Sequence, residues 1–135
     1  MRAENGFSLT ELLVALAILA LITGLAAPRI VGYLSTSKTK AAKIQVEQYN
    51  AALELFLIDI GRYPTTEEGL ESLTRNVADE PFWAGPYLNK REAPADPWGR
   101  AYRYEVNAGA GPSVYSLGAD GAPGGTGENA DVYPN

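Results

Sequence analysis

The sequence has 135 residues and contains no cysteine and no histidine. Without cysteine the fold cannot have a disulfide, and no thiolate is present to act as a nucleophile or metal ligand. Without histidine the chain lacks the commonest general base and the commonest ligand of transition metals. We therefore do not expect an enzyme. Carboxylate chemistry and the binding of hard cations such as Ca²⁺ remain open.

Acidic side chains are missing from one region, and basic ones are scarce in the next. Residues 29–46 contain Arg29, Lys38, Lys40 and Lys43 and no acid, whereas from Glu47 onward there are fourteen acids and six bases. The acidic body argues against nucleic-acid binding. The basic stretch directly follows an apolar run, a position that suits contact with lipid headgroups. A solvated helix face explains these charges equally well.

The apolar run itself contains almost no charge. Residues 7–27 include a single charged side chain, Glu11. As a helix, these twenty-one residues would be about 31 Å long, which matches a bilayer hydrocarbon core of about 30 Å. We expect a membrane helix, since a small domain rarely buries a helix that is apolar on every side. A secretory signal peptide is the alternative, but Pro28 directly after the candidate cleavage site and the uninterrupted helical pattern argue against it.

The helical pattern continues from Ile30 to about Ile60 with two apolar stripes. The first stripe consists of Ala42, Val46, Tyr49, Leu53, Phe56 and Ile60, and the second of Ile44, Ala51, Leu55 and Ile58. One stripe would cover the chain's own domain, and the other would be available to neighbouring copies. A single wide core face is the alternative. Pro28 should kink or locally melt this helix.

The remaining elements are predicted to be short. Gly61 and Pro64 should end the long helix. A short second helix is expected over 66–75 with Leu70 and Leu73 facing inward, followed by a loop over 83–97. Two antiparallel strands are expected over 101–106 and 113–117. Residues 118–135 contain five Gly, two Pro and three acids and should form a loop that cannot pack a core unaided.

The segment Gly6–Glu11, followed by the apolar run, resembles the N-terminus of type IV pilins and their secretion relatives. In that family a membrane aspartyl peptidase cuts after the glycine on the cytoplasmic side and methylates the new N-terminal phenylalanine. The resemblance implies cleavage between Gly6 and Phe7, methylation of Phe7, and an assembly role for Glu11 at the fifth mature position. Pro28 falls where the family often has a kinking proline.

Four later blocks resemble, in the same order, the major pseudopilins of type II secretion systems, the general secretion pathway protein G family. They are Gly61–Leu70, Asp96–Gly99 with Tyr102 and Tyr104, Tyr115–Gly121, and Ala130–Asp131. The resemblance implies an α+β, type IV pilin-like fold. A long N-terminal helix, its first half transmembrane, would pack on a small antiparallel sheet with a C-terminal calcium loop. The implied parts are a leader (1–6), a transmembrane and polymerisation helix (7–28) and a periplasmic domain (29–135).

Two explanations compete for Glu11. Ser8-Leu9-Thr10-Glu11 is a capping box, in which Glu11 reaches back to the start of the helix and meets its positive end. The family instead implies that Glu11 meets the N-terminal ammonium of Phe7, on an adjacent subunit or on its own chain. We favour pairing, mainly because the resemblance implies it; in addition, capping alone does not require an acid beside lipid.

Asp120 and Asp131 bracket a twelve-residue loop, DGAPGGTGENAD. Ala122 and Gly124 stand where an EF-hand needs oxygen side chains, so this loop is not an EF-hand. An exposed flexible loop is the plain alternative, but the resemblance implies a Ca²⁺ site. Its expected ligands are Asp120, Asp131 and the carbonyl of Leu117, with less support for the Gly125 carbonyl and for Glu128. Pro123 stands where the family usually has an acid, which leaves the loop geometry open. Trp98 is expected to anchor the core.

The resemblance implies a major structural subunit of a periplasmic pseudopilus, whose polymerisation drives export of folded proteins across the outer membrane. The implied partners are further copies of the chain, minor pseudopilins, an inner-membrane assembly platform and the prepilin peptidase. The protein would be single-pass in the bacterial inner membrane, although the basic stretch 29–46 by itself would favour the opposite orientation. The alternatives are a subunit of an adhesive or motility pilus, which commonly has a C-terminal disulfide, and a membrane-anchored periplasmic enzyme.

Overall fold

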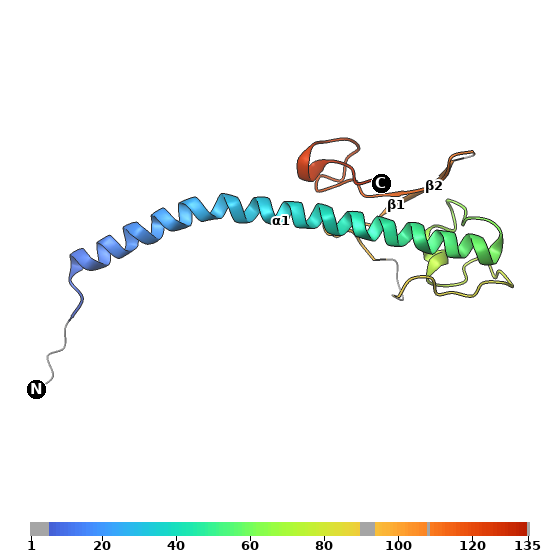
Figure 1. Cartoon of the computed structure of the whole chain (residues 1–135), viewed down its shortest axis with the longest axis horizontal. Helices are drawn as coiled ribbons and strands as arrows, with labels where there is room; N and C mark the ends of the chain where they lie inside the picture. The colour runs from blue at the N-terminus through green and yellow to red at the C-terminus, as the bar shows by residue number, and fades with distance from the viewer. Residues whose placement is uncertain (1–5, 90–93, 108, 135) are drawn as a thin grey trace, which may run out of the picture. The chain divides into compact units, whose positions relative to one another are not determined.

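The computed structural model describes residues 6–89, 94–107 and 109–134, with residues 27–32 described through their backbone alone. The chain forms two compact units, one ending at Ser35 and the other comprising Thr36–Asn135. The elements are α1 (Leu9–Ile60), the 3₁₀ helix η1 (Leu70–Leu73), β1 (Arg103–Asn107), β2 (Gly111–Tyr115) and the 3₁₀ helix η2 (Gly127–Asn129) (Figure 1). This arrangement confirms the predicted α+β class.

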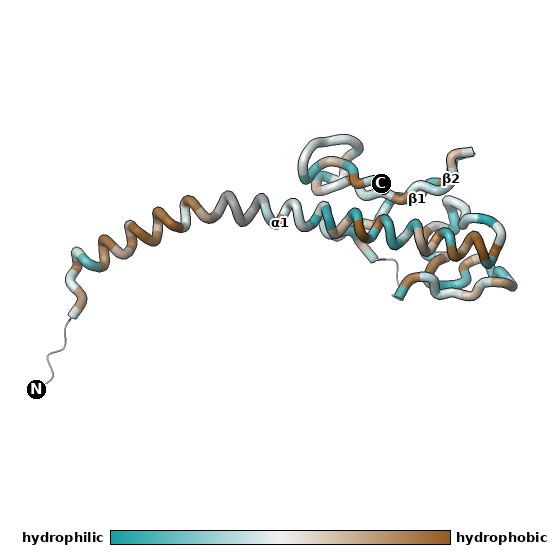
Figure 2. The backbone as a smooth tube through the Cα atoms, viewed as in Figure 1, coloured by the Kyte–Doolittle hydropathy of each residue, from teal (hydrophilic) through white to brown (hydrophobic). Residues whose placement is uncertain are grey.

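Helix α1 is continuous over 52 residues. Its start is apolar almost throughout, whereas polar and apolar residues alternate along its second half (Figure 2). The local melting that was one of the two outcomes expected at Pro28 is not found, because the backbone stays helical through this residue. A proline removes only one donor from the helical ladder, so the turns on either side can continue. The kink stays a prediction. Of the predicted leader, only Gly6 lies among the described residues.

The first predicted stripe forms the core of the second unit. Ala42, Val46, Tyr49, Leu53 and Phe56 are all buried. All of them except Ala42 pack, together with Ala52, against Leu70 and Leu73 of η1 and against Tyr102 and Val114 around the sheet, with Ile60 at the edge of the cluster. Spacings of three and four residues place this stripe on one side of α1. The prediction that this stripe covers the chain's own domain is confirmed.

The second helix is shorter than predicted. Leu70 and Leu73 are buried as expected, but the 3₁₀ helix begins only at Leu70. Gly69, with φ 62° and ψ −170°, has a conformation outside the helical region and interrupts the predicted 66–75 segment. The preceding turn is closed by a capping box in which Thr65 N donates to Glu68 Oε2 at 2.7 Å and Glu68 N donates to Thr65 Oγ1 at 3.2 Å.

The sheet is a single antiparallel hairpin. Its register pairs Arg103 with Tyr115 and Asn107 with Gly111. Compared with the prediction, β1 begins two residues later, and β2 begins at Gly111 and ends at Tyr115. Beyond Tyr115 the backbone changes partner, because Ser116 forms an isolated antiparallel bridge with Val132. The C-terminal segment is thereby tied beside the sheet.

Candidate functional site

The predicted processing block lies immediately before α1. The Phe7 side chain is 87% exposed. A Cβ added at Gly6 would meet nothing within 4 Å. The predicted cleavage bond is therefore not enclosed by other described parts of the chain. No contact with a described residue requires glycine at position 6, so the proposed need for it comes from a partner that binds this segment.

Ser8 and Glu11 cap the start of α1 reciprocally. Glu11 N donates to Ser8 Oγ at 3.2 Å, and Ser8 N donates to Glu11 Oε2 at 3.4 Å. This is the capping box that the sequence predicted, and it places a carboxylate at the positive end of the helix. The pairing of Glu11 with an ammonium needs a free amino group on Phe7, which exists only after cleavage. The cap of the uncut chain and pairing in the cut chain are therefore compatible.

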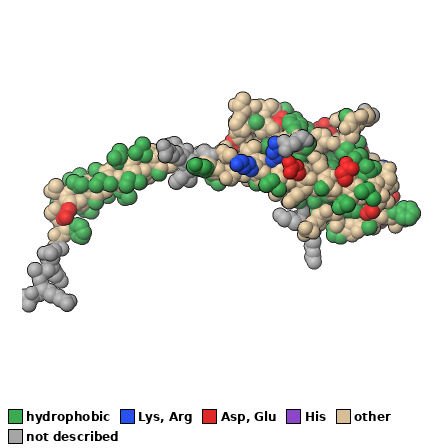
Figure 3. All heavy atoms as spheres, in the orientation of Figure 1, with side chains coloured by type: hydrophobic (Ala, Val, Ile, Leu, Met, Phe, Trp, Pro, Cys, Tyr) green, Lys and Arg blue, Asp and Glu red, His purple; other side chains and the backbone are tan. Residues whose placement is uncertain are grey.

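Leu9–Ala26 is the one stretch, among the residues described, that is long and apolar enough to cross a membrane by length and composition. None of its 18 residues is buried. In Figure 3 hydrophobic side chains cover this stretch, with an acidic side chain near its start. Thr23 is accommodated because its Oγ1 donates to the carbonyl of Leu19 at 2.8 Å. A helix apolar on every side and uncovered by its own chain requires lipid or other helices around it.

The second predicted stripe lies on the side of α1 opposite the core. Ile44, Leu55 and Ile58 are 56%, 50% and 75% exposed. Ala51 between them is exposed as well. These four residues recur at spacings of seven, four and three, the pattern of a seam between packed helices. Two separate faces therefore exist on α1, and the alternative of a single wide core face is wrong.

The predicted metal ligands of the C-terminal loop lie in a segment stabilised by its own hydrogen bonds. Asp131 Oδ2 accepts from Gly124 N at 2.9 Å, and the amide of Asp131 donates to Gly124 O at 3.1 Å. Asp131 Oδ1 is buried and has no hydrogen-bond partner. Asp120 is exposed, and its Oδ1 accepts from Ala122 N at 3.0 Å. An orphaned buried carboxylate oxygen is costly unless something binds it.

The other three predicted ligands differ in what their oxygens contact. The carbonyls of Leu117 and Gly125 accept no hydrogen bond within the described part of the chain. Glu128 Oε1 instead accepts from Trp98 Nε1 at 3.1 Å. Trp98 is half-buried and lies outside the main core cluster, so it contacts the loop and does not anchor the core as predicted.

A buried polar network, for which the sequence predicts no role, lies at the root of this loop. Asp96 is 5% exposed, and its Oδ2 accepts from Ser116 Oγ at 2.6 Å. Its Oδ1 accepts from the amides of Trp98 and Arg100 at 3.0 and 2.8 Å, and Ser116 Oγ accepts from Gly118 N at 3.2 Å. The Asp-Pro-Trp-Gly block resembles a block of the family, but no local sequence pattern indicates its contact with Ser116, twenty residues away.

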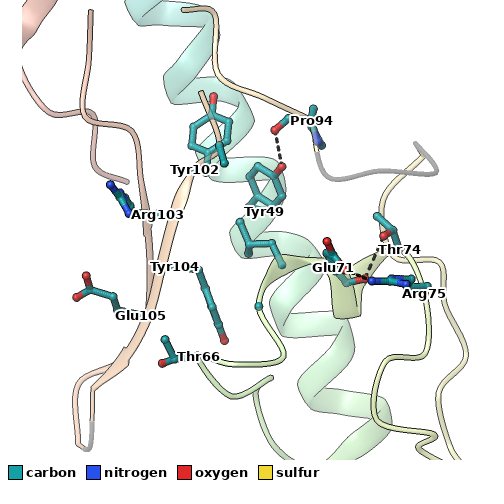
Figure 4. A pocket seen from close by; sticks show the side chains of 13 residues that line it. Tyr49, Thr66, Glu71, Thr74, Arg75, Pro94, Tyr102, Arg103, Tyr104 and Glu105 are labelled. Atoms are coloured by element: carbon teal, nitrogen blue, oxygen red, sulfur yellow. Dashed lines mark hydrogen bonds and ion pairs between the residues drawn. The ribbon is translucent and has the colours of Figure 1, made fainter. Parts of the chain in front are cut away.

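A groove of about 940 Å³ lies between α1, η1 and β1 (Figure 4). Tyr49 and Tyr102 contribute to its lining and pack edge to face with ring centroids 5.1 Å apart. Burial raises the pKa of both phenols, and burial with the nearby charge of Glu68 raises the pKa of Tyr104 to about 12. Their hydroxyls donate to backbone carbonyls, Tyr49 to Pro94 at 2.8 Å and Tyr104 to Pro64 at 2.7 Å. These phenols therefore tie α1 and β1 to the backbone of the neighbouring loops.

Among the described residues no group of three or more histidine, cysteine, aspartate or glutamate side chains is placed to bind a metal ion. A cation in the C-terminal loop would therefore rely on two aspartates and on backbone carbonyls. Ca²⁺ accepts such a ligand set, because it takes six to eight oxygen ligands in flexible geometry.

Two family models together match nearly the whole chain. The family described as Type II secretion system (T2SS), protein G matches residues 29–135. The family described as Prokaryotic N-terminal methylation motif matches residues 1–27. The boundary between the matches adjoins Pro28, where the apolar stretch ends.

Curated proteins and a solved structure are similar along most of their length. Type II secretion system core protein G of Pseudomonas aeruginosa is 36% identical, covering 97% of this chain and 94% of that protein. The protein of the same name from Vibrio cholerae serotype O1 is 35% identical, covering 98% and 92%. The crystal structure of the major pseudopilin from the type 2 secretion system of enterohaemorrhagic Escherichia coli matches with a TM-score of 0.60 and 28% identity, covering 78% of this chain and 93% of that one.

Proposed function

This chain belongs to the type II secretion system protein G family, and from that premise we propose that it is the major structural subunit of a pseudopilus whose growth drives export of folded proteins across the outer membrane. The observation that carries this proposal is the pair of matches, in which a methylation motif is followed by a protein G domain over residues 29–135. The two faces of α1 give it a physical basis, because one face completes the chain's own domain and the other is available for a second copy.

The chain is a membrane-anchored, pilin-like protein. We propose that Leu9–Ala26 spans the bacterial inner membrane with the globular domain in the periplasm, and that the prepilin peptidase cuts between Gly6 and Phe7 and methylates Phe7. The support is the exposure of this block and the match of the methylation motif to residues 1–27. Placing the block at the membrane surface would present the Gly6–Phe7 bond to a membrane peptidase.

Assembly into a filament would use two parts of α1. Cleavage converts the Phe7 amide into an ammonium, and Glu11 of an adjacent subunit is the proposed partner, because a carboxylate in an apolar setting needs a compensating charge. Further along, the stripe of Ile44, Ala51, Leu55 and Ile58 would pack against neighbouring copies. Minor pseudopilins and an inner-membrane assembly platform are the other proposed partners.

The C-terminal loop is proposed to bind one calcium ion. The residues fit this ion, since Asp131 Oδ1 is buried without a partner and the Leu117 and Gly125 carbonyls accept no hydrogen bond in the described structure. Glycine is also required here: a Cβ at Gly125 would lie 2.4 Å from Asn129 O. Asp120 and Asp131 would supply the negative charge. Glu128 is the weakest proposed ligand, because its carboxylate already bonds Trp98. Bound calcium would compensate the negative charges of the two aspartates.

Gene deletion tests the proposed function. Loss of the gene should remove exported enzymes from the medium while leaving surface pili intact, and a wild-type copy should restore export. A Gly6→Val copy, which should remain uncut, is the matched control and should not restore it. Export that continues unchanged while surface pili disappear would contradict the proposal and favour a pilus subunit.

A further inference from the structure

Arg100 connects two segments that are far apart in sequence. Its backbone is fixed by the Asp96 turn, in which Asp96 N donates to Arg100 O at 2.7 Å and Arg100 N donates to Asp96 Oδ1 at 2.8 Å. Asp96 is itself buried and bonded to Ser116. The side chain of Arg100 therefore extends from a rigid base, which limits the conformational entropy lost when its guanidinium binds.

The guanidinium binds two successive carbonyls at the root of the C-terminal loop. Nη1 donates to Gly118 O and Nη2 donates to Ala119 O, both at 2.8 Å. A planar fork of two nitrogens can satisfy two neighbouring oxygens at once, and hydrogen bonds from a charged donor are stronger than neutral ones. These bonds fix the backbone directly before Asp120.

Gly121 allows the guanidinium to lie this close. A Cβ at this position would be 2.7 Å from Nε and 2.9 Å from Cζ of Arg100, and Gly121 also has φ +69°. Glycine alone combines this backbone conformation with the absence of a clashing side chain. The loop backbone is thus fitted around Arg100 on both sides of Asp120.

We propose that Arg100 is a positioning residue that keeps the root of the C-terminal loop closed before any cation binds, and that it thereby strengthens calcium binding by the loop. The second part rests on the proposed calcium site. The contacts that close the root are all made between protein groups: they are the Arg100 bonds, the Ser116–Val132 bridge and the bond from Ala119 N to Glu128 O at 2.9 Å. A loop that is already closed needs no ordering when the ion binds. Its apparent affinity for calcium is therefore not lowered by a population of open, non-binding molecules.

The positive charge of Arg100 acts against calcium binding, whereas its hydrogen bonds favour it. The direction in which the calcium dissociation constant changes therefore shows which effect is larger. A fixed positive charge near a cation site repels the cation, so Arg100 would weaken binding if its charge mattered more than its hydrogen bonds. Arg100→Lys retains the charge but replaces the fork by one nitrogen, and Arg100→Met removes both. Arg103→Lys is the matched control, because the Arg103 guanidinium makes no hydrogen bond within the described residues.

The experiment uses the full chain in detergent micelles. In chelator, hydrogen exchange of the Ala119 and Asp131 amides should accelerate about tenfold in both Arg100 variants and remain unchanged in Arg103→Lys. By calorimetric titration with CaCl₂, the dissociation constant should rise about tenfold in Arg100→Lys, the size expected if about one loop in ten stays closed. Global melting curves in chelator show whether a variant has lost its fold. If Arg100→Met does not fold, Arg100→Gln replaces it as the variant that removes the charge.

Unchanged amide exchange in folded Arg100→Lys and Arg100→Met would overturn the positioning role. Tighter calcium binding by Arg100→Met than by wild type would show that Arg100 acts through repulsion and would overturn the second part. If wild-type protein binds no calcium, the proposed calcium site and the second part both fail, while amide exchange in chelator still decides whether Arg100 closes the loop.

Discussion

The two parts of α1 differ in how their apolar residues are covered. The stretch Leu9–Ala26 is apolar on all sides, and none of it is buried. Between Ala42 and Phe56 one side is buried in the core, while Ile58 and Ile44 on the opposite side are 75% and 56% exposed. The comparison shows that different parts of one helix can be stabilised by different environments. Its start depends on lipid or partners, and its second half depends on its own domain with one further face for a neighbour.

The largest effect should come from blocking cleavage before the first part of α1, because the uncut chain cannot become a mature subunit. Gly6→Val should leave the precursor uncut in the membrane, because a branched side chain obstructs a peptidase cleft that accepts glycine. Assembly should then be abolished. Gly6→Ala is the matched control and should still be cut, since it adds only one methyl group. Mass spectrometry of the membrane fraction reads the result; a wild-type mature chain that starts at Arg29 would indicate an ordinary signal peptide.

Replacing Glu11 separates capping from pairing. Glu11→Ala should leave the chain inserted and folded, since removing a charge eases insertion, but filament assembly should fall at least tenfold. Glu11→Gln can still accept the hydrogen bond from Ser8 N, as glutamine also serves in capping boxes, but it carries no charge. Assembly yield from sheared or sedimented filaments is the measurement. Normal assembly by Glu11→Gln would show that Glu11 acts only as a cap.

The two faces of the second half should respond differently to substitution. Ile58→Asp should reduce filament assembly severalfold with little change in Tm, because the side chain is 75% exposed in the isolated chain. Leu53→Ala on the buried face should lower stability by about 2–5 kcal/mol through the cavity that it creates. Melting curves and filament yields of both variants, measured side by side, check this. A large fall in Tm for Ile58→Asp would show that this face is covered within the subunit.

Calcium should stabilise the C-terminal region by mass action. At a hundredfold excess over the dissociation constant the gain is about 2.7 kcal/mol, which raises the Tm of a domain of this size by several degrees. Asp131→Asn retains an acceptor for Gly124 N but lacks the charge, so it should lose this gain. Glu128→Gln should lose less of it. The measurement compares melting curves of the full chain in detergent with CaCl₂ and with chelator; curves that coincide for the wild type would contradict the calcium proposal.

A smaller effect is expected from the ion pairs at the end of α1. Arg62 binds both oxygens of Glu68, at 2.7 and 2.8 Å, which lowers the pKa of that carboxyl below 4.5. A lowered pKa adds stability above pH 4.5 that is lost as the pH falls through the folded-state pKa. Glu68→Gln should therefore make Tm fall less steeply below pH 4.5. The free energy of unfolding that this variant loses at neutral pH should be about 0.5–1 kcal/mol, typical of partly exposed pairs. Exposed Glu67→Gln is the control and should follow the wild type.

Local sequence patterns predicted those features that depend on neighbouring residues. The stripe from Ala42 to Phe56 and the capping box at Ser8 follow from spacings of three and four, and the structure contains both. The predicted extent of the second helix was wrong at Gly69, because the backbone conformation of this residue does not follow from residue type alone. Glycine permits a positive φ but does not require it.

The network around the C-terminal loop could not be predicted in the same way. Asp96 meets Ser116, and Arg100 meets Gly118, across eighteen to twenty residues of chain. No period of a helix or strand connects such positions, and the contact forms only because β1 and β2 fold back on each other. The position of Glu128 beside Trp98 likewise depends on the fold of the whole loop.

Cysteine labelling tests the central claim, that other copies of the chain cover the second stripe of α1, which consists of Ile44, Ala51, Leu55 and Ile58. Because the chain has no cysteine, a single Ile58→Cys variant carries one reactive thiol without background. Maleimide should label this thiol rapidly in detergent-dispersed subunits and at least tenfold more slowly in assembled filaments. Phe82→Cys, a site that is 74% exposed off the helix, controls for the filament's general accessibility. Equal labelling of Ile58→Cys in subunits and filaments would contradict the account.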